Sequence, residues 1–102
     1  MTFLAMEREI PGRTADEFAP HLEAEAAEVR NLYRAGTVRQ AYFRQDWHGA
    51  VLLLESPDTE EARRALDDLP LVRNGLIAFD LIPLGPYTGL ERLFRQPGSS
   101  RE

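Results

Sequence analysis

The stretch TVRQAYFRQDWHGAVLLLES, residues 37–56, decides the fold of this sequence. Residues 37–45 are rich in β-branched and aromatic side chains, and residues 46–49 (Asp-Trp-His-Gly) have the composition of a turn. Residues 50–56 contain the unbroken apolar run VLLL, which is typical of a central strand covered on both faces. The stretch therefore predicts a β-hairpin whose second strand lies inside a sheet.

Upstream of the hairpin the sequence predicts one strand and one helix. Residues 2–10 begin apolar, pass into alternation and end at a Pro-Gly pair, which indicates a strand closed by a turn. Residues 14–17 (TADE) then have the form of a capping box. Pro20 cannot donate a backbone hydrogen bond, so the helix is either kinked there or has a short first turn before a main helix that starts at Pro20. Gly36 suits the left-handed residue that ends a helix.

Downstream of the hairpin a second helix and a last strand follow. Residues 58–61 (DTEE) offer another capping pattern, and apolar side chains recur at helical spacing until Pro70. Residues 76–84, LIAFDLIPL, predict a strand, and residues 88–95 are expected to add a helical turn. Residues 96–102 form a polar tail that we expect to be mobile. The order β-α-β-β-α-β predicts the ferredoxin-like α+β fold, in which two helices cover one face of an antiparallel sheet.

The other face of this predicted sheet has no cover within the chain. The VLLL run and the last predicted strand supply apolar side chains to both faces of the sheet. An apolar sheet face is rarely left in water. We therefore expect a second copy of the chain to bury it, giving a homodimer or a larger homo-oligomer of the dimeric α/β barrel type.

Length and composition limit the range of functions. Of the 102 residues 43% are hydrophobic and 28% charged, so we expect residues 1–95 to form one soluble domain. The formal net charge is −5 and the Arg residues are spread along the chain, which disfavours a nucleic-acid partner. Without Cys and with two isolated His, no metal centre is expected. The sequence has neither a signal-peptide pattern nor an apolar run that could span a membrane, so we expect a cytoplasmic protein without a membrane partner.

One carboxylate falls on the apolar side of the first predicted helix, in PHLEAEAAEVRNLY, residues 20–33. At about 100° per residue, Glu25 lies within an apolar stripe. The stripe consists of Phe18, Leu22, Val29 and Tyr33. Burying a carboxylate raises its pKa, which would make Glu25 a base usable near neutral pH. The alternative is a surface glutamate that reaches outward or pairs with an Arg. His21 lies one turn earlier and can contact Glu25, although a solvated helix position is the more ordinary role for it.

Strict alternation along the first strand of the hairpin puts Arg39 on the same side as Ala41 and Phe43. A guanidinium in such apolar company can bind a substrate carboxylate or stabilise a developing enolate. The alternative is an ion pair between Arg39 and Glu25 or Glu7.

Three more side chains of the hairpin are candidates for substrate binding. Tyr42 and Trp47 each carry a hydrogen-bond donor at the end of an apolar ring, although both types of residue more often serve in packing. His48 stands beside Gly49 and can equally be an ordinary turn residue. The sequence contains neither a phosphate-binding glycine pattern nor a nucleophilic triad.

The span from Gly36 to Pro86 resembles muconolactone Δ-isomerase, without a gap. The features that carry the resemblance are Gly36-Thr37, Arg39, an aromatic residue at Tyr42, Pro57 and Leu69-Pro70-Leu71. Counting back from Gly36 places the helical glutamate of that family at Glu25. The family's Trp is Tyr42 here, and its hairpin His falls on Trp47, with His48 displaced by one. The chain also resembles the YciI-related proteins, but Leu69 replaces the Asp of their His-Asp pair.

The resemblance implies a cofactor-free isomerase, assembled from dimers, with a pocket between helix and sheet. Glu25 would move a proton to shift a double bond in an unsaturated lactone or related small cyclic acid, as in aromatic catabolism. Arg39 would hold the dienolate or the substrate carboxylate, with His21, Tyr42, Trp47 and His48 around the substrate. Two alternatives remain open: a cofactor-independent oxygenase or cyclase on the same barrel, and a non-catalytic module for small-molecule binding or assembly.

Overall fold

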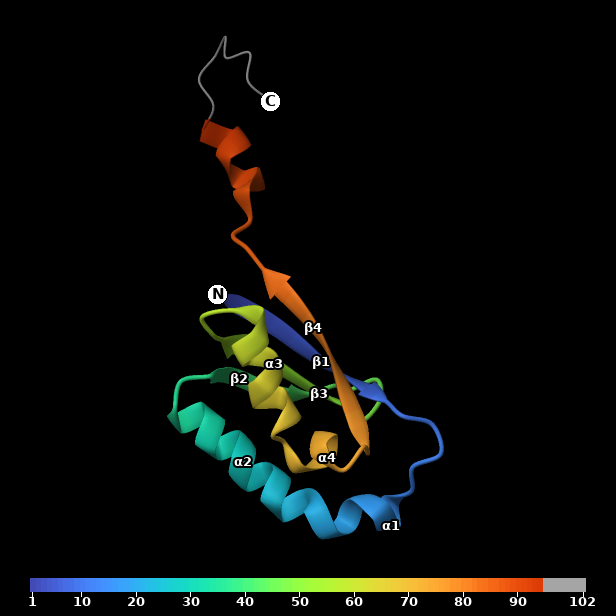
Figure 1. The fold of residues 1–102 in the computed structure, drawn as a ribbon. Coiled ribbons are helices and arrows are strands. Elements are labelled where there is room, and N and C mark those ends of the chain that lie inside the picture. Colours follow the sequence, from blue (N-terminus) through green and yellow to red (C-terminus); the bar gives the residue numbers. More distant parts are fainter. Residues whose placement is uncertain (95–102) are drawn as a thin grey trace.

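The computed structural model describes residues 1–94 and shows an antiparallel sheet with helices on one face (Figure 1). Its four strands lie in the order β2-β3-β1-β4. They are β1 (Thr2–Glu9), β2 (Val38–Phe43), β3 (Ala50–Glu55) and β4 (Ile77–Leu84). This topology confirms the ferredoxin-like α+β arrangement. The polar tail predicted over residues 96–102 lies outside the described residues.

The first helical region has three parts, α1 (Ala15–Phe18), the 3-10 turn η1 (Ala19–His21) and α2 (Leu22–Arg34). The Thr14 amide donates a 2.9 Å hydrogen bond to Oε1 of Glu17, as a capping box requires. Pro20 lies in η1, so a short turn does precede the main helix, which begins at Leu22 rather than at Pro20. Tyr33, predicted in the apolar stripe, is 61% exposed, whereas Leu32 beside it is partly buried against the core.

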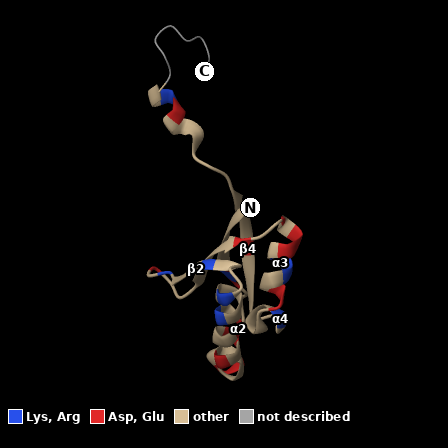
Figure 2. Cartoon of the chain, turned by 90° about the vertical axis from the view of Figure 1, so that its left-hand side faces the viewer, with Lys and Arg blue, Asp and Glu red and all other residues tan. Residues whose placement is uncertain are grey.

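The second helical region begins with α3 (Thr59–Asp67), whose N-terminus is capped by Asp58 through a 2.8 Å hydrogen bond from the Glu61 amide. Pro70 ends the predicted helix but also opens a short additional helix, α4 (Pro70–Arg73), which the sequence did not predict. Helices α2, α3 and α4 lie on the same side of the sheet (Figure 2). No helix among residues 1–94 has the length and apolarity needed to cross a membrane.

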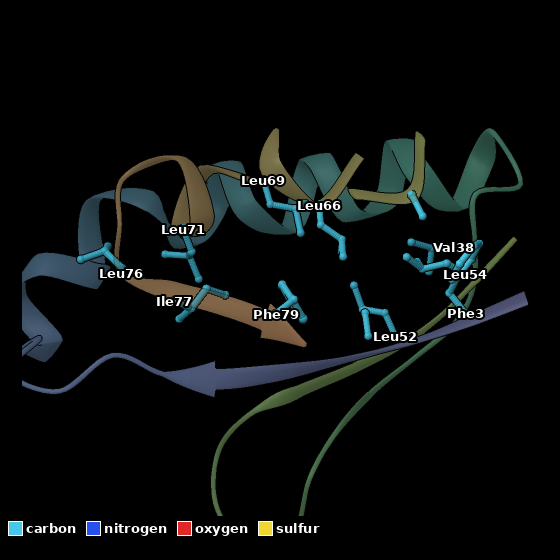
Figure 3. Close-up of a cluster of buried hydrophobic side chains, with 12 residues drawn as sticks. Phe3, Val38, Leu52, Leu54, Leu66, Leu69, Leu71, Leu76, Ile77 and Phe79 are labelled. Carbon is cyan, nitrogen blue, oxygen red and sulfur yellow. The ribbon is translucent and has the colours of Figure 1, made fainter. Parts of the chain in front are cut away.

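The core lies between these helices and the sheet (Figure 3). Phe3 of β1 is opposite Leu54 of β3, which is in turn opposite Val38 of β2, so the three side chains share the helix-covered face. Leu66 of α3 and Leu69 cover the core from the helix side, and all five side chains are almost completely buried. Burial of this apolar area is the main source of stability for the fold.

A β-bulge interrupts the alternation of β2. Val38 and Gln40 are opposite consecutive residues of β3, Leu54 and Leu53, which leaves Arg39 as the extra residue. Val38 is therefore buried in the core, whereas Arg39 is exposed. The prediction of strict alternation along this strand is wrong, because the bulge shifts the pattern by one residue and puts Val38, rather than its neighbour Arg39, in register with Ala41 and Phe43 on one face.

The second face of the sheet is apolar as well. Leu4 of β1 lies opposite Leu53 of β3 and Ile82 of β4, and Met6 lies opposite Val51. Ile82 is 40% exposed, and the other four side chains are only partly buried. No helix among residues 1–94 lies over this face (Figure 2).

Beyond the sheet the chain continues into an arm that stands away from the main body (Figure 1). The arm ends in the 3-10 helix η2 (Thr88–Phe94), in the region where a helical turn was predicted. Its apolar side chains Tyr87, Leu90, Leu93 and Phe94 are largely exposed. The strand that leads into it, β4, forms one edge of the sheet and carries Pro83 opposite Phe3.

Candidate active site

A mostly apolar cavity of about 520 Å³ lies between α2 and the hairpin end of the sheet. This volume lies within the usual range for small-molecule sites. The space exists because three residues that face it, Ala26 of α2, Ala41 of β2 and Ala50 of β3, carry only a methyl group. The rim is formed partly by Leu22 and Phe43, which are 52% and 61% exposed. The cavity is therefore open to solvent on one side.

Glu25 is at the wall of this cavity, on the side of α2 where the helical pattern predicted an apolar stripe. Its Oε1 accepts a 2.9 Å hydrogen bond from the Leu71 amide at the start of α4. Burial raises the pKa of Glu25 above its ordinary value, the bond from Leu71 opposes this rise, and the negative charges of Glu7 and Glu28 add to it. Among residues 1–94, no group donates a hydrogen bond to Oε2 of Glu25. A carboxyl group with a raised pKa and one free oxygen can act as base and acid.

A second carboxylate, Glu7 of β1, also lines the cavity. From the sequence alone, Glu7 is expected only as a possible ion-pair partner of Arg39. Its Oε1 accepts a 2.9 Å hydrogen bond from the amide of Ala50 in β3. The signal that could have identified it is the strand period, since Phe3, Ala5 and Glu7 alternate onto the helix-covered face.

Two of the predicted substrate-binding residues also line the cavity, His48 and Tyr42. The imidazole of His48 stacks on the ring of Phe43, with centroids 4.4 Å apart and planes 27° apart. This contact orients the His48 ring at the cavity edge. The Tyr42 hydroxyl donates a 2.9 Å hydrogen bond to the side chain of Gln40.

The other three predicted site residues lie elsewhere. Arg39 does not line the cavity, and its Nε donates a 2.9 Å hydrogen bond to the carbonyl oxygen of Gly36. His21 is partly buried at the junction of η1 and α2, outside the cavity wall. The Trp47 ring lies under the guanidinium of Arg44, 4.8 Å from it. The structure thus brings Glu25, Tyr42 and His48 together, while the catalytic role of Arg39 stays a prediction.

An adjoining cavity of about 480 Å³ shares Glu7 and His48 with the first. Trp47 lies in its wall, as do Glu9 and Arg13. The Nε of Arg13 donates a 3.0 Å hydrogen bond to the carbonyl oxygen of Gly75, which turns the side chain toward the backbone that follows α4. In neither cavity, nor elsewhere in residues 1–94, do three or more potential ligands gather in a way that could hold a metal ion.

Comparisons with known proteins find similarity in structure rather than in sequence. No protein-family model matches the chain, and no curated protein matches it. Among solved structures, muconolactone isomerase is similar, with a TM-score of 0.68 and 21% identity over 100% of this chain and 97% of that one. A second is 5-chloro-2-hydroxyhydroquinone dehydrochlorinase from Burkholderia phenoliruptrix AC1100, solved with 2,5-dihydroxybenzoquinone. It has a TM-score of 0.68 and 18% identity over 83% of this chain and 94% of that one.

These two similarities bear on the fold. Both cover nearly the whole length of the other chain, so the helices, the sheet and their order are shared. The resemblance to muconolactone isomerase that the sequence suggested is therefore confirmed for the fold. Both similar proteins are enzymes that act on small molecules, but a fold at this level of identity does not carry a reaction with it.

Proposed function

We propose that the protein is a small isomerase-type enzyme that shifts a double bond in an unsaturated lactone or related small cyclic molecule, with Glu25 as the group that moves the proton. The observation that carries the proposal is the setting of Glu25. Its carboxylate lies at the wall of an apolar cavity of about 520 Å³, and burial raises its pKa. The enzymatic nature of the two proteins with the same fold adds support.

The proposed reaction needs one carboxyl group. Ionised Glu25 removes a proton from the carbon between the carbonyl group and the double bond of the lactone. The electron pair spreads over the conjugated system as a dienolate. The carboxyl group, now neutral, returns the proton at the far carbon of that system, so the double bond moves and no atom is gained or lost. A well-placed base of this kind contributes about 10²–10⁴-fold to the rate.

The hydrogen bond from Leu71 supports this role by fixing the base. Because Oε1 of Glu25 is held by a backbone amide, its Oε2 keeps a defined position relative to the cavity. Fixed geometry lowers the entropy that must be lost on reaching the transition state. In this proposal His48, oriented by Phe43, donates a hydrogen bond to the dienolate oxygen. Arg39 would take that part only if it left the carbonyl oxygen of Gly36.

Proton exchange tests the proposal most directly. An uncharged unsaturated lactone is incubated with the protein in heavy water, and deuterium uptake and double-bond migration are followed by NMR. We expect both processes with the wild type and a loss of at least about 100-fold in Glu25→Gln. Glu23→Gln is the matched control, because it removes the same charge from an exposed position of α2. Equal rates in wild type and Glu25→Gln would refute the proposal.

The size of the cavity favours a second candidate function. A volume of about 520 Å³ is several times that of a small lactone, and the aromatic residues Phe18 and Phe43 are among those that line it. Such a site fits a polycyclic phenol, the substrate class expected for a cofactor-independent oxygenase or cyclase. Oxygen consumption with a polycyclic phenol, absent with lactones, would favour this candidate. Binding without turnover of either class would favour a non-catalytic binding module.

The proposed enzyme acts as a homodimer or a larger homo-oligomer. Support comes from two apolar surfaces that no element of residues 1–94 covers. One is the outer sheet face around Leu4, Leu53 and Ile82. The other is the arm, in which Tyr87 is 79% and Phe94 is 81% exposed. Contiguous exposed apolar surface of this kind marks an interaction site.

A further inference from the structure

The main cavity contains two carboxylates and no fixed cation. Glu7 lines it from β1 of the sheet and Glu25 lines it from helix α2. No Arg is among the residues of its wall. We infer that the site selects uncharged, hydroxyl-bearing ring molecules and excludes carboxylates, and that Glu7 enforces this selection. The inference rests on the proposed function in that it assigns a substrate class to the same cavity. It departs from the sequence-based expectation of a cyclic acid held by Arg39.

The hydrogen-bonding capacity of Glu7 and Glu25 favours a ligand that carries hydroxyl groups. The two carboxylates are held in the same way, each by one backbone amide at 2.9 Å, Ala50 for Glu7 and Leu71 for Glu25. In the described part of the chain, the Oε2 atom of each receives no hydrogen bond. An ionised carboxylate can only accept hydrogen bonds, so these two oxygens are complementary to ligand hydroxyl groups. A ligand carboxylate offers further acceptors and no donor.

Charge is the second argument. A ligand carboxylate would enter a partly buried site with two like charges, and such repulsion is stronger there than in water. Glu28 adds a third negative charge close enough to raise the pKa of Glu25. His48 is the only basic side chain among the residues that line this cavity, and one imidazole cannot balance two carboxylates.

The adjoining cavity does not supply a free cation either. Its Arg13 lies in a wall that also contains Glu7 and Glu9, so carboxylates outnumber the guanidinium there. The Nε of Arg13 is also engaged with the carbonyl oxygen of Gly75. An anionic ligand that reached toward Arg13 would have to pass Glu7, which borders both cavities.

The position of Glu7 makes it a specificity-determining residue rather than a surface charge. It lies opposite Phe79 of β4, which is 4% exposed, on the face of the sheet that the helices cover. Its side chain thus points between sheet and helix. The hydrogen bond from Ala50 holds it at the hairpin end, where the cavity opens.

Three butenolides that differ in one substituent test the inference by binding, measured calorimetrically at neutral pH. The substituents are methyl, hydroxymethyl and carboxymethyl, at the same ring carbon. For the wild type we expect the hydroxymethyl compound to bind tightest and the carboxymethyl compound at least about tenfold more weakly. Glu7→Gln should reduce this preference at least about tenfold. It keeps an acceptor for the Ala50 amide, and its melting temperature and circular dichroism verify that it folds.

Glu23→Gln is again the charge-matched control and should leave the preference unchanged. Tighter binding of the carboxymethyl compound by the wild type would overturn the inference, and loss of that binding in Arg13→Gln would identify the cation responsible. An unchanged preference in Glu7→Gln would also overturn it. Failure of this inference is distinguishable from failure of the proposed reaction, because the order of binding affinities is measured without turnover. The order can hold in a protein that isomerises none of the three compounds.

Discussion

The Leu71 amide donates a 2.9 Å hydrogen bond to Oε1 of Glu25 and thereby joins α4 to the first turn of α2. The two residues are 46 positions apart in the sequence. The short helix α4, opened by Pro70, presents its first free amide to the carboxylate. The same bond lowers the pKa of Glu25, so burial and the charges of Glu7 and Glu28 must outweigh it for the pKa to be raised.

The pH dependence of the reaction should report on Glu25. Because the base must be ionised, kcat/KM for a lactone should fall as the pH drops through the pKa of Glu25, by about tenfold per pH unit below it. Its midpoint should lie above 4.5, the ordinary value for a glutamate. In Glu7→Gln one of the neighbouring negative charges is gone, so the midpoint should move to lower pH. A midpoint at or below 4.5 in the wild type would contradict the proposed environment of Glu25.

Glu25→Gln should become more stable relative to the wild type as the pH rises. A carboxyl group whose pKa is raised in the folded state costs stability once it ionises. The contribution of this group to the stability of the wild type is therefore most favourable below the ordinary glutamate pKa. It is lost as the pH rises through the raised pKa of Glu25 in the folded protein. Glutamine has no charge and still accepts the bond from Leu71. The effect is measured as the melting temperature of Glu25→Gln minus that of the wild type, at pH 4 and at pH 8. A smaller value of this difference at pH 8 than at pH 4 would contradict the prediction.

Gly49→Ala should move the ring of Trp47. A Cβ atom added at Gly49 would lie 2.5 Å from ring carbon Cζ3 of Trp47. Because Trp47 is partly exposed, we expect the ring to swing outward rather than the fold to fail. The chain has one Trp, so its emission should shift to longer wavelength. Gly85→Ala is the control, since an added Cβ there meets no atom within 4 Å. Identical spectra for wild type and Gly49→Ala would refute this arrangement.

Leu53→Glu should disrupt the proposed oligomer. Leu53 lies at the centre of the outer sheet face, opposite Leu4 of β1, and its side chain does not enter the core. We expect the wild type to scatter light as a dimer or larger particle at micromolar concentration and the variant to approach the 11.6 kDa of one chain. Arg64→Glu on the exposed surface of α3 is the control. A wild type that is already monomeric would refute the oligomer.

Local signals made the element order predictable. Asp58 and Thr14 mark helix starts because their capping interactions depend only on residues three positions away. Gly36, with φ of 83°, marks the end of α2 for a reason that is also local. The position of Glu25 on the apolar side of α2 followed from helical periodicity.

The features that the sequence did not predict depend on contacts between distant segments. The bulge at Arg39 is defined by the pairing of the neighbouring residues of β2 with Leu53 and Leu54 of β3. No residue type in β2 predicts it. It leaves Arg39 without a partner in β3 and shifts the alternation of the residues that follow. Glu7 becomes a cavity residue only because β1 lies beside β3, where Ala50 can donate to it. Sequence patterns thus singled out Glu25 but not Glu7, the second carboxylate of the same cavity.

The proline in β4 limits the ways in which molecules of this protein can associate. β4 is a border strand, and Pro83 has no amide hydrogen to offer to an incoming neighbour. Asp80, three positions earlier, adds a charge near the same border. Pairing of another strand with the edge of β4, the kind of association that leads to fibrils, is therefore disfavoured. Association through the apolar outer face of the sheet is more favourable.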